Sequence, residues 1–145
     1  MRPRELPAAL EAVRAFPSLR FVIDHLGKPD IAGGAFDAWA ALIRPFGPEA
    51  GHVWCKLSGM ATEADWASWA TEDLQPYVHE AVRVFGPSRC LYGSDWPVCL
   101  LAGSYARILC ALKEAIAHLS PDERARILAG SARELYRLEV PHTPL

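Results

Sequence analysis

The sequence has none of the features of a membrane-spanning, secreted or nucleic-acid-binding protein. Its apolar runs, such as residues 98–102, are far shorter than the roughly 18 residues that a membrane-spanning helix needs. No long apolar stretch follows the charged residues 1–5, as it would in a signal peptide. The 15 Lys and Arg residues are balanced by 17 Asp and Glu residues, and the formal net charge of −2 offers nothing to a polyanion. We therefore expect a cytoplasmic protein without a nucleic-acid or membrane partner.

Common motifs of metal and nucleotide sites are also missing. The four cysteines, at positions 55, 90, 99 and 110, form no Cys-x-x-Cys pair, and their spacing matches no zinc site. There is no His-x-His, no His-Glu-x-x-His and no Gly-x-Gly-x-x-Gly. Because each cysteine lies in an apolar stretch, we expect all four to be buried, reduced thiols.

What the sequence does contain is enough apolar material, 51% of 145 residues, for one globular domain. Three short segments rich in β-branched, aromatic and other apolar residues predict buried strands, at residues 19–25, 52–58 and 90–95. Apolar residues at helical spacing predict a helix before each strand. The first of these helices is expected to stop at Pro17 and the third at Gly86.

The chain after the third strand is predicted to be helical almost to its end. Ser120 and Glu123 have the spacing of a capping box, which marks a helix start. We expect Gly130 to end this helix and Ser131 to cap another short one. Residues 141–145 are predicted to form a flexible tail.

The resulting order, α-β-α-β-α-β-α, predicts an α/β fold with parallel strands joined by helical crossovers. The predicted strands end 33 and 37 residues apart, which corresponds to one βα unit each time. A doubly wound open sheet and a (β/α)8 barrel share this rhythm. An open sheet usually has about five strands or more, and a barrel needs eight in about 250 residues. Only three strands are predicted here.

In parallel α/β folds the functional residues lie at the carboxyl ends of the strands. Two of the predicted strands end in a residue suited to proton transfer or metal binding, His25 and Asp95. On the middle strand, alternation of side chains places Trp54, Lys56 and Ser58 on one face. These strand ends form the candidate site.

Each candidate also has a structural interpretation. His25 would then be an ordinary hydrogen-bonded histidine, Asp95 would cap the following turn, and Lys56 would extend to solvent. An indole at Trp96, beside Asp95, would exclude water and shape a pocket. Asp24 is expected to point to the opposite side of its strand from His25, so that the two should not work as a pair.

Three segments resemble conserved blocks of the amidohydrolase-related family. They are FVIDHLGKP at 21–29, VWCKLSG at 53–59 and LYGSDWPV at 91–98, and residues 127–136 resemble the C-terminal helix of the same family. Together, and in this order and spacing, they are most similar to the lactonase branch that includes L-fuconolactonase and 2-pyrone-4,6-dicarboxylate lactonase.

The resemblance implies a fold and a set of site residues. The fold would be a partial (β/α)8 TIM barrel, its last three βα units (strands six to eight) with the C-terminal helices. His25 matches the histidine at the end of strand six, and Asp95 matches the catalytic aspartate of strand eight. Lys56 matches a position on strand seven, and with Ser58 and Trp96 it is the candidate substrate contact.

The family also implies an activity and a cofactor. Members hydrolyse lactones or related cyclic esters and amides, which are small molecules. Some use one divalent metal and others none, so the cofactor stays open, with His25 and Asp95 as the only candidate metal ligands. The family's first strand supplies a His-x-His pair, to which nothing in this chain corresponds.

Residues 1–140 are therefore interpreted as the C-terminal part of an amidohydrolase-related barrel domain. One hypothesis is a lactonase-like hydrolase in which Asp95 activates water, with an incomplete site in the isolated chain. The alternative is a non-catalytic half-barrel remnant, a binding or vestigial module; a third is a complete small open-sheet protein. Three strands of a barrel would leave two edges and the inward side chains Phe21, Ile23 and Leu91 in solvent. We expect self-association, pairing with a missing N-terminal half, or a longer gene product.

Overall fold

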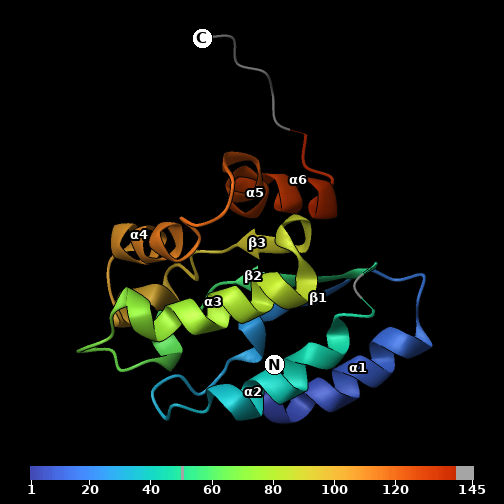
Figure 1. Cartoon of the computed structure of the whole chain (residues 1–145), viewed down its shortest axis with the longest axis horizontal. Coiled ribbons are helices and arrows are strands. Elements are labelled where there is room, and N and C mark those ends of the chain that lie inside the picture. The colour runs from blue at the N-terminus through green and yellow to red at the C-terminus, as the bar shows by residue number, and fades with distance from the viewer. Residues whose placement is uncertain (50, 140–145) are drawn as a thin grey trace.

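The three strands form one parallel sheet in sequence order. The computed structural model describes residues 1–49 and 51–139. In it β1 (Phe21–Ile23), β2 (Val53–Leu57) and β3 (Cys90–Tyr92) lie in the order β1-β2-β3 (Figure 1). Within the described residues β1 and β3 each pair with β2 alone, so each keeps one free edge. The fold is thus α/β with a small parallel sheet, as predicted.

Six α-helices surround the sheet in the residues that the structure describes. They are α1 (Leu6–Ala15), α2 (Phe36–Ile43), α3 (Thr71–Phe85), α4 (Tyr105–Ala115), α5 (Pro121–Ala125) and α6 (Ser131–Tyr136). Short 3-10 turns lie at Pro3–Glu5, Asp24–Gly27, Arg44–Phe46, Ala61–Glu63, Pro87–Arg89 and Val98–Leu101. None of the helices in this part of the chain is long and apolar enough to cross a bilayer. The predicted tail, 141–145, lies outside the described residues.

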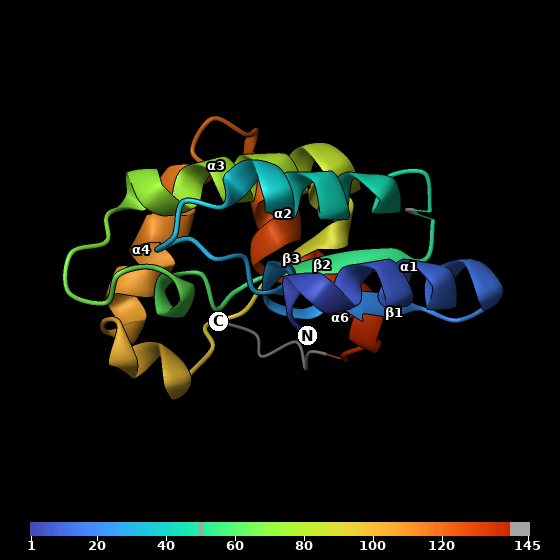
Figure 2. The ribbon, with the colours of Figure 1, turned by 90° about the horizontal axis from the view of Figure 1, so that it is seen from below.

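The two faces of the sheet are covered by different helices. α2 and α3 lie over one face and α6 lies on the other (Figure 2). The main core fills the space on the α2 and α3 side, with Ile23, Cys55 and Leu57 from the strands. On the opposite face Leu135 of α6 packs against Trp54 and other strand residues in a small second cluster.

This arrangement corrects the prediction for the inward side chains. Ile23 is only 2% exposed and belongs to the main core, and Phe21 packs partly buried against the same core. The register pairs Val22 with Trp54, so Val22 is the β1 residue that shares a face with Trp54. Leu91 is buried because α6 covers it. The face of β1 had been assigned one residue out of phase, and a shift of one residue exchanges the two faces, whereas Leu91 of β3 does share the face of Trp54.

The helix boundaries were predicted well where a stop residue is present. α1 ends before Pro17 and α3 ends at Gly86. The capping box is confirmed: the Ser120 backbone N–H donates to Glu123 Oε2 at 2.8 Å, and the Glu123 N–H donates to Ser120 Oγ at 3.3 Å. The strands are shorter than predicted, most of all β1.

The prediction for the C-terminal helices was wrong in one respect. Gly130 has helical angles, φ −60° and ψ −45°, and the chain continues through a π-helical turn (Arg126–Gly130) directly into α6. Ser131 does not cap α6. It is fully buried and its hydroxyl donates to the carbonyl oxygen of Ser88 at 2.9 Å. The Ser131 hydroxyl therefore bonds to a residue far away in the sequence instead of capping the helix.

Three of the four cysteines are buried as expected. The buried ones are Cys55, Cys90 and Cys99. Burial raises the pKa of the Cys90 thiol to about 12. Cys110 lies on the outer side of α4 and is exposed, against the prediction. All four are free thiols.

Candidate active site

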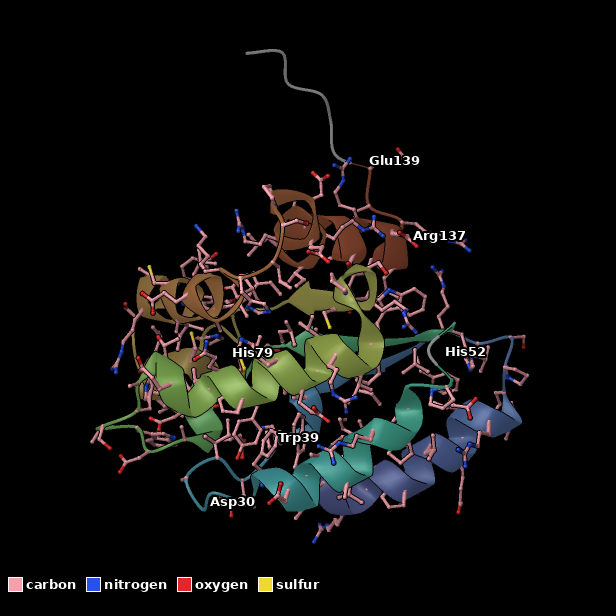
Figure 3. All side chains as sticks on the ribbon, viewed as in Figure 1. Asp30, Trp39, His52, His79, Arg137 and Glu139 are labelled. Carbon is pink, nitrogen blue, oxygen red and sulfur yellow. The ribbon has the colours of Figure 1, made fainter. Side chains whose placement is uncertain are left out.

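The chain turns sharply after β1, and this turn places His25. Residues 25–28 all have left-handed backbone angles, with φ between 52° and 70°. Non-glycine residues rarely adopt such angles, and those that do cluster at functional sites. The turn is anchored by the fully buried Leu26, whose carbonyl oxygen accepts a 2.7 Å hydrogen bond from Trp39 Nε1. Trp39 itself lies between α2 and α3 (Figure 3).

The His25 imidazole is held from one side by the end of β2. Its Nδ1 lies 2.7 Å from Ser58 Oγ, in a hydrogen bond to a side chain that is 1% exposed. Gly59 has a φ of +63°, and a Cβ there would lie only 2.9 Å from the same nitrogen. The ring therefore rests on a glycine backbone, with Nε2 on its other side.

Asp95 lies on the Nε2 side of the ring. Its Oδ1 is 3.6 Å from His25 Nε2, and its side chain is 12% exposed. Thr62 Oγ1 lies 3.5 Å from Asp95 Oδ2, but its closer acceptor is the Gly59 carbonyl oxygen at 3.0 Å. In the described residues the carboxylate caps no backbone amide of the following turn; instead the Asp95 carbonyl oxygen accepts from the Cys99 N–H at 2.8 Å. The structure thus brings together the two predicted acid–base residues.

Asp24 is close to His25, which corrects the prediction that they point apart. Its Oδ2 lies 3.3 Å from His25 Nε2, and its Oδ1 lies 2.8 Å from Lys56 Nζ. The prediction assumed that the strand continues to His25. The strand ends at Ile23, and the left-handed turn that follows changes the direction of the His25 side chain.

The ion pair between Asp24 and Lys56 shifts both side chains. Burial disfavours the charged form of each, but their mutual attraction outweighs it, so the pKa of Asp24 is lowered and the pKa of Lys56 is raised. The nearby His25 also lowers the pKa of Asp24. The two side chains keep 47% and 26% exposure, which leaves them open to a ligand. Lys56 is thus neither buried alone nor extended freely into solvent.

The Trp96 side chain lies largely in solvent. Its side chain is 65% exposed, and its backbone N–H donates to Ser94 Oγ at 3.2 Å. No contact between its indole and His25 is seen in the described part of the chain. Its role as a substrate contact stays a prediction, as do the roles of Lys56 and Ser58.

Four site residues were missed from the sequence. Asp24 was dismissed on strand alternation, and Thr62 carries no sequence signal. Gly59 and Gly93 each follow a strand, where glycine often marks a close approach of the backbone. A Cβ at Gly93 would lie 3.0 Å from side-chain atoms of both Lys56 and Ser58. These glycines could have been found from their position.

Comparison with known proteins identifies the family. A family model described as "Amidohydrolase" matches residues 1–138. The chain belongs to the amidohydrolase family. This confirms the resemblance seen in the strand-end motifs.

Among its amidohydrolase relatives are named lactonases. An L-fucono-1,5-lactonase of Burkholderia ambifaria is 42% identical over 96% of this chain and 49% of its own length. A 2-pyrone-4,6-dicarboxylate hydrolase of Comamonas testosteroni is 33% identical over 64% of this chain. A crystal structure of an amidohydrolase from Burkholderia multivorans with bound zinc superposes with a TM-score of 0.89 and 36% identity, covering 96% of this chain and 51% of that one. The chain spans about half the length of the two Burkholderia proteins, and its match to the Comamonas hydrolase covers 32% of that protein.

The residues of this chain do not by themselves fit a zinc ion. Zinc takes four ligands, or three and a water. Within the described residues no group of three His, Cys, Asp or Glu side chains has the arrangement of a metal site, although Asp24 and Asp95 both approach His25 Nε2. His25 and Asp95 would supply two donors, and the nearby Asp24 is already held by Lys56.

Proposed function

We propose that this amidohydrolase chain carries the acid–base residues of a lactone hydrolase, namely Asp95 and His25. The observation that carries the proposal is the 3.6 Å approach of Asp95 Oδ1 to His25 Nε2 across the ends of two strands. The lactonase names of the relatives support the substrate class.

In the proposed reaction Asp95 accepts a proton from water as the water oxygen attacks the lactone carbonyl carbon. His25 Nε2–H donates to the carbonyl oxygen, on which negative charge develops. The ring carbon–oxygen bond then breaks, and Asp95 returns its proton to the departing alkoxide. The product is the open-chain hydroxy acid, so water and lactone are both accounted for. No step is assigned to a metal.

The other predicted residues take supporting roles in this proposal. Lys56 and Trp96 are exposed beside the acid–base pair and are proposed to contact the substrate. Ser58 is buried and bonded to His25 Nδ1, so we assign it to orienting that ring. With Ser58 on Nδ1, Nε2 is left to face the substrate.

We also propose that the sheet is the last part of a (β/α)8 barrel, strands six to eight, which further strands complete. The free edges of β1 and β3 support this, as does the TM-score of 0.89 over half of a longer relative. Trp54 adds a third observation: its Nε1 is buried without a hydrogen-bond partner among the described residues. A buried donor of this kind costs free energy unless an acceptor is supplied. The partner would be the preceding strands of the barrel, and in their absence a second copy of this chain.

The test combines the chain with the missing part of a barrel. The chain is mixed with a polypeptide carrying the part of the Burkholderia ambifaria lactonase that it does not match, and hydrolysis of L-fucono-1,5-lactone is followed. We expect turnover from the mixture and none from either part alone. Asp95→Asn should reduce turnover by roughly 100-fold or more, as for loss of a general base.

Asp37→Asn, which changes an exposed carboxylate on α2, is the matched control and should leave turnover intact. Robust turnover by the isolated chain would contradict the incomplete site. Undiminished turnover in the Asp95→Asn mixture would contradict the proposed base. A mixture that forms a complex but hydrolyses nothing would favour the non-catalytic half-barrel.

A further inference from the structure

An ion pair fastens the left-handed turn that carries His25 to the turn after β2. Lys28 is the last residue of the left-handed stretch, and its Nζ donates to Glu63 Oε1 at 2.7 Å. The two side chains keep only 28% and 15% exposure. The backbone joins the same segments, because the Ala32 N–H donates to the Glu63 carbonyl oxygen at 2.9 Å. Glu63 thus holds the chain after β1 at two points.

Both ends of this ion pair lie beside supports of the imidazole ring. The Lys28 backbone N–H donates to the His25 carbonyl oxygen at 2.7 Å, so a shift of Lys28 is passed on to His25. Left-handed angles at non-glycine residues are unfavourable and persist only where the surrounding contacts fix them. Glu63 ends the turn Ala61–Glu63, which closely follows Gly59, the residue on whose backbone the ring rests. The ion pair therefore links the turn that carries the imidazole to the backbone beneath it.

This link does not depend on strands supplied from outside the chain. The turns that hold Lys28 and Glu63 follow β1 and β2, and these two strands pair directly with each other. No further strand can enter between the two turns when a barrel is completed. The hydrolytic steps described above give neither side chain a task.

We infer that Lys28 and Glu63 are positioning residues, whose ion pair holds the turn at residues 25–28 so that His25 Nε2 stays beside Asp95. A hydrogen bond between two charged groups is roughly twice as strong as one between neutral groups. Misplacement of a reacting group by about 1 Å can lower a rate by roughly 100-fold. The effect on rate rests on the proposed lactone hydrolysis, whereas the effect on the position of the ring does not.

The position of the ring is tested first, without any turnover. An ideal Cβ on Gly59 would lie 3.1 Å from the His25 Cβ, so these two residues approach closely. Their α and β protons should therefore give a nuclear Overhauser contact in the isolated chain. Glu63→Gln and Lys28→Met each remove the ion pair, and both should weaken or abolish this contact.

Arg14 and Glu49 provide a matched control. Their side chains form an ion pair at 2.9 Å between residues 35 positions apart, the same separation as between Lys28 and Glu63. Glu49 precedes β2, so this ion pair lies at the opposite end of the strand from the His25 turn. Glu49→Gln should remove an ion pair and leave the nuclear Overhauser contact unchanged.

The effect on rate is tested in the barrel mixture described above, with L-fucono-1,5-lactone. Glu63→Gln and Lys28→Met should each lower kcat by roughly 10- to 100-fold and leave KM within about twofold, because neither side chain is assigned a substrate contact. The double variant should lose no more than either single variant, since both changes break the same pair. Lys28→Arg keeps the cation and should keep most of the rate. Glu49→Gln should change neither kcat nor KM.

The outcomes separate this inference from the proposed function. An unchanged contact between His25 and Gly59 in Glu63→Gln overturns the inference, whether or not the mixture hydrolyses the lactone. A rise in KM with kcat unchanged also overturns it, because the pair would then bind substrate. Equal losses of kcat in Glu49→Gln and Glu63→Gln overturn it too, because they indicate general destabilisation. A weakened contact without any lactone turnover overturns the proposed function alone.

Discussion

A methyl group at Gly59 would test whether the His25 ring rests on this backbone. An ideal Cβ would lie 2.9, 3.0 and 3.1 Å from three His25 atoms, so the ring must shift by some tenths of an ångström. Overpacking of this kind costs about 1–3 kcal/mol. Because φ is +63°, alanine adds left-handed strain of about 1–2 kcal/mol. We expect Gly59→Ala to lower the free energy of unfolding by the sum of the two.

Gly34 provides the matched control for the strain alone. Its φ is +66°, and a Cβ there would meet nothing within 4 Å. Gly34→Ala should therefore lose only the strain contribution, about 1–2 kcal/mol. Urea unfolding gives both values, and each 1 kcal/mol corresponds to about 2–4 °C in Tm for a chain of this size. Equal losses in the two variants, with lactone turnover by the mixture described above intact in Gly59→Ala, would refute the contact with His25.

Three other expectations concern acid stability, metal content and association. Glu80 accepts hydrogen bonds from Arg83 and Arg44, which hold its pKa at about 2 against the opposing effect of burial. Its stabilising contribution is complete above pH 4.5 and is lost as the pH falls toward 2. Because both arginines are half exposed, Glu80→Gln should lower the free energy of unfolding by only about 1–2 kcal/mol at neutral pH. The free energy of unfolding of this variant should also fall less steeply between pH 4.5 and 2 than that of the unmodified chain, and an equally steep fall would contradict this. The purified chain should bind zinc well below one equivalent by elemental analysis, and a full equivalent would show that its own residues complete a metal site. In sedimentation the isolated chain should self-associate, and Leu100→Asp with Leu101→Asp, in an exposed apolar turn, should weaken that association; a concentration-independent monomer would refute it.

The elements of this fold were predictable because their signals are local. The third helix has apolar residues at regular spacing and a glycine stop, and α3 ends at that glycine. Ser120 and Glu123 cap α5 with each other, so four residues of sequence suffice to see the motif. Gly130 failed as a stop because the buried Ser131 found partners in the turn before β3, which no local pattern reveals.

The candidate site was predictable only in part. His25 and Asp95 were found because strand ends converge in parallel folds, and the structure places them 3.6 Å apart. Asp24 was missed because alternation was carried past Ile23, where the strand has already ended. Left-handed angles at non-glycine residues have no composition signal, so the direction of the His25 ring could not be read from the chain. Thr62 approaches Asp95 from 33 residues away in the sequence, and no local pattern predicts such a tertiary approach.

The left-handed backbone of residues 25–28 also limits which positions near this site can be mutated to change substrate preference. A backbone that runs through four successive positive φ values tolerates few sequences, and β-branched side chains are the least suited to it. Most random substitutions at residues 25–28 would give misfolded variants. This stretch is therefore a poor target for laboratory evolution of a new substrate preference. The turn at Val98–Leu101, whose neighbours are ordinary right-handed or extended backbone, is where a mutant library has room to explore.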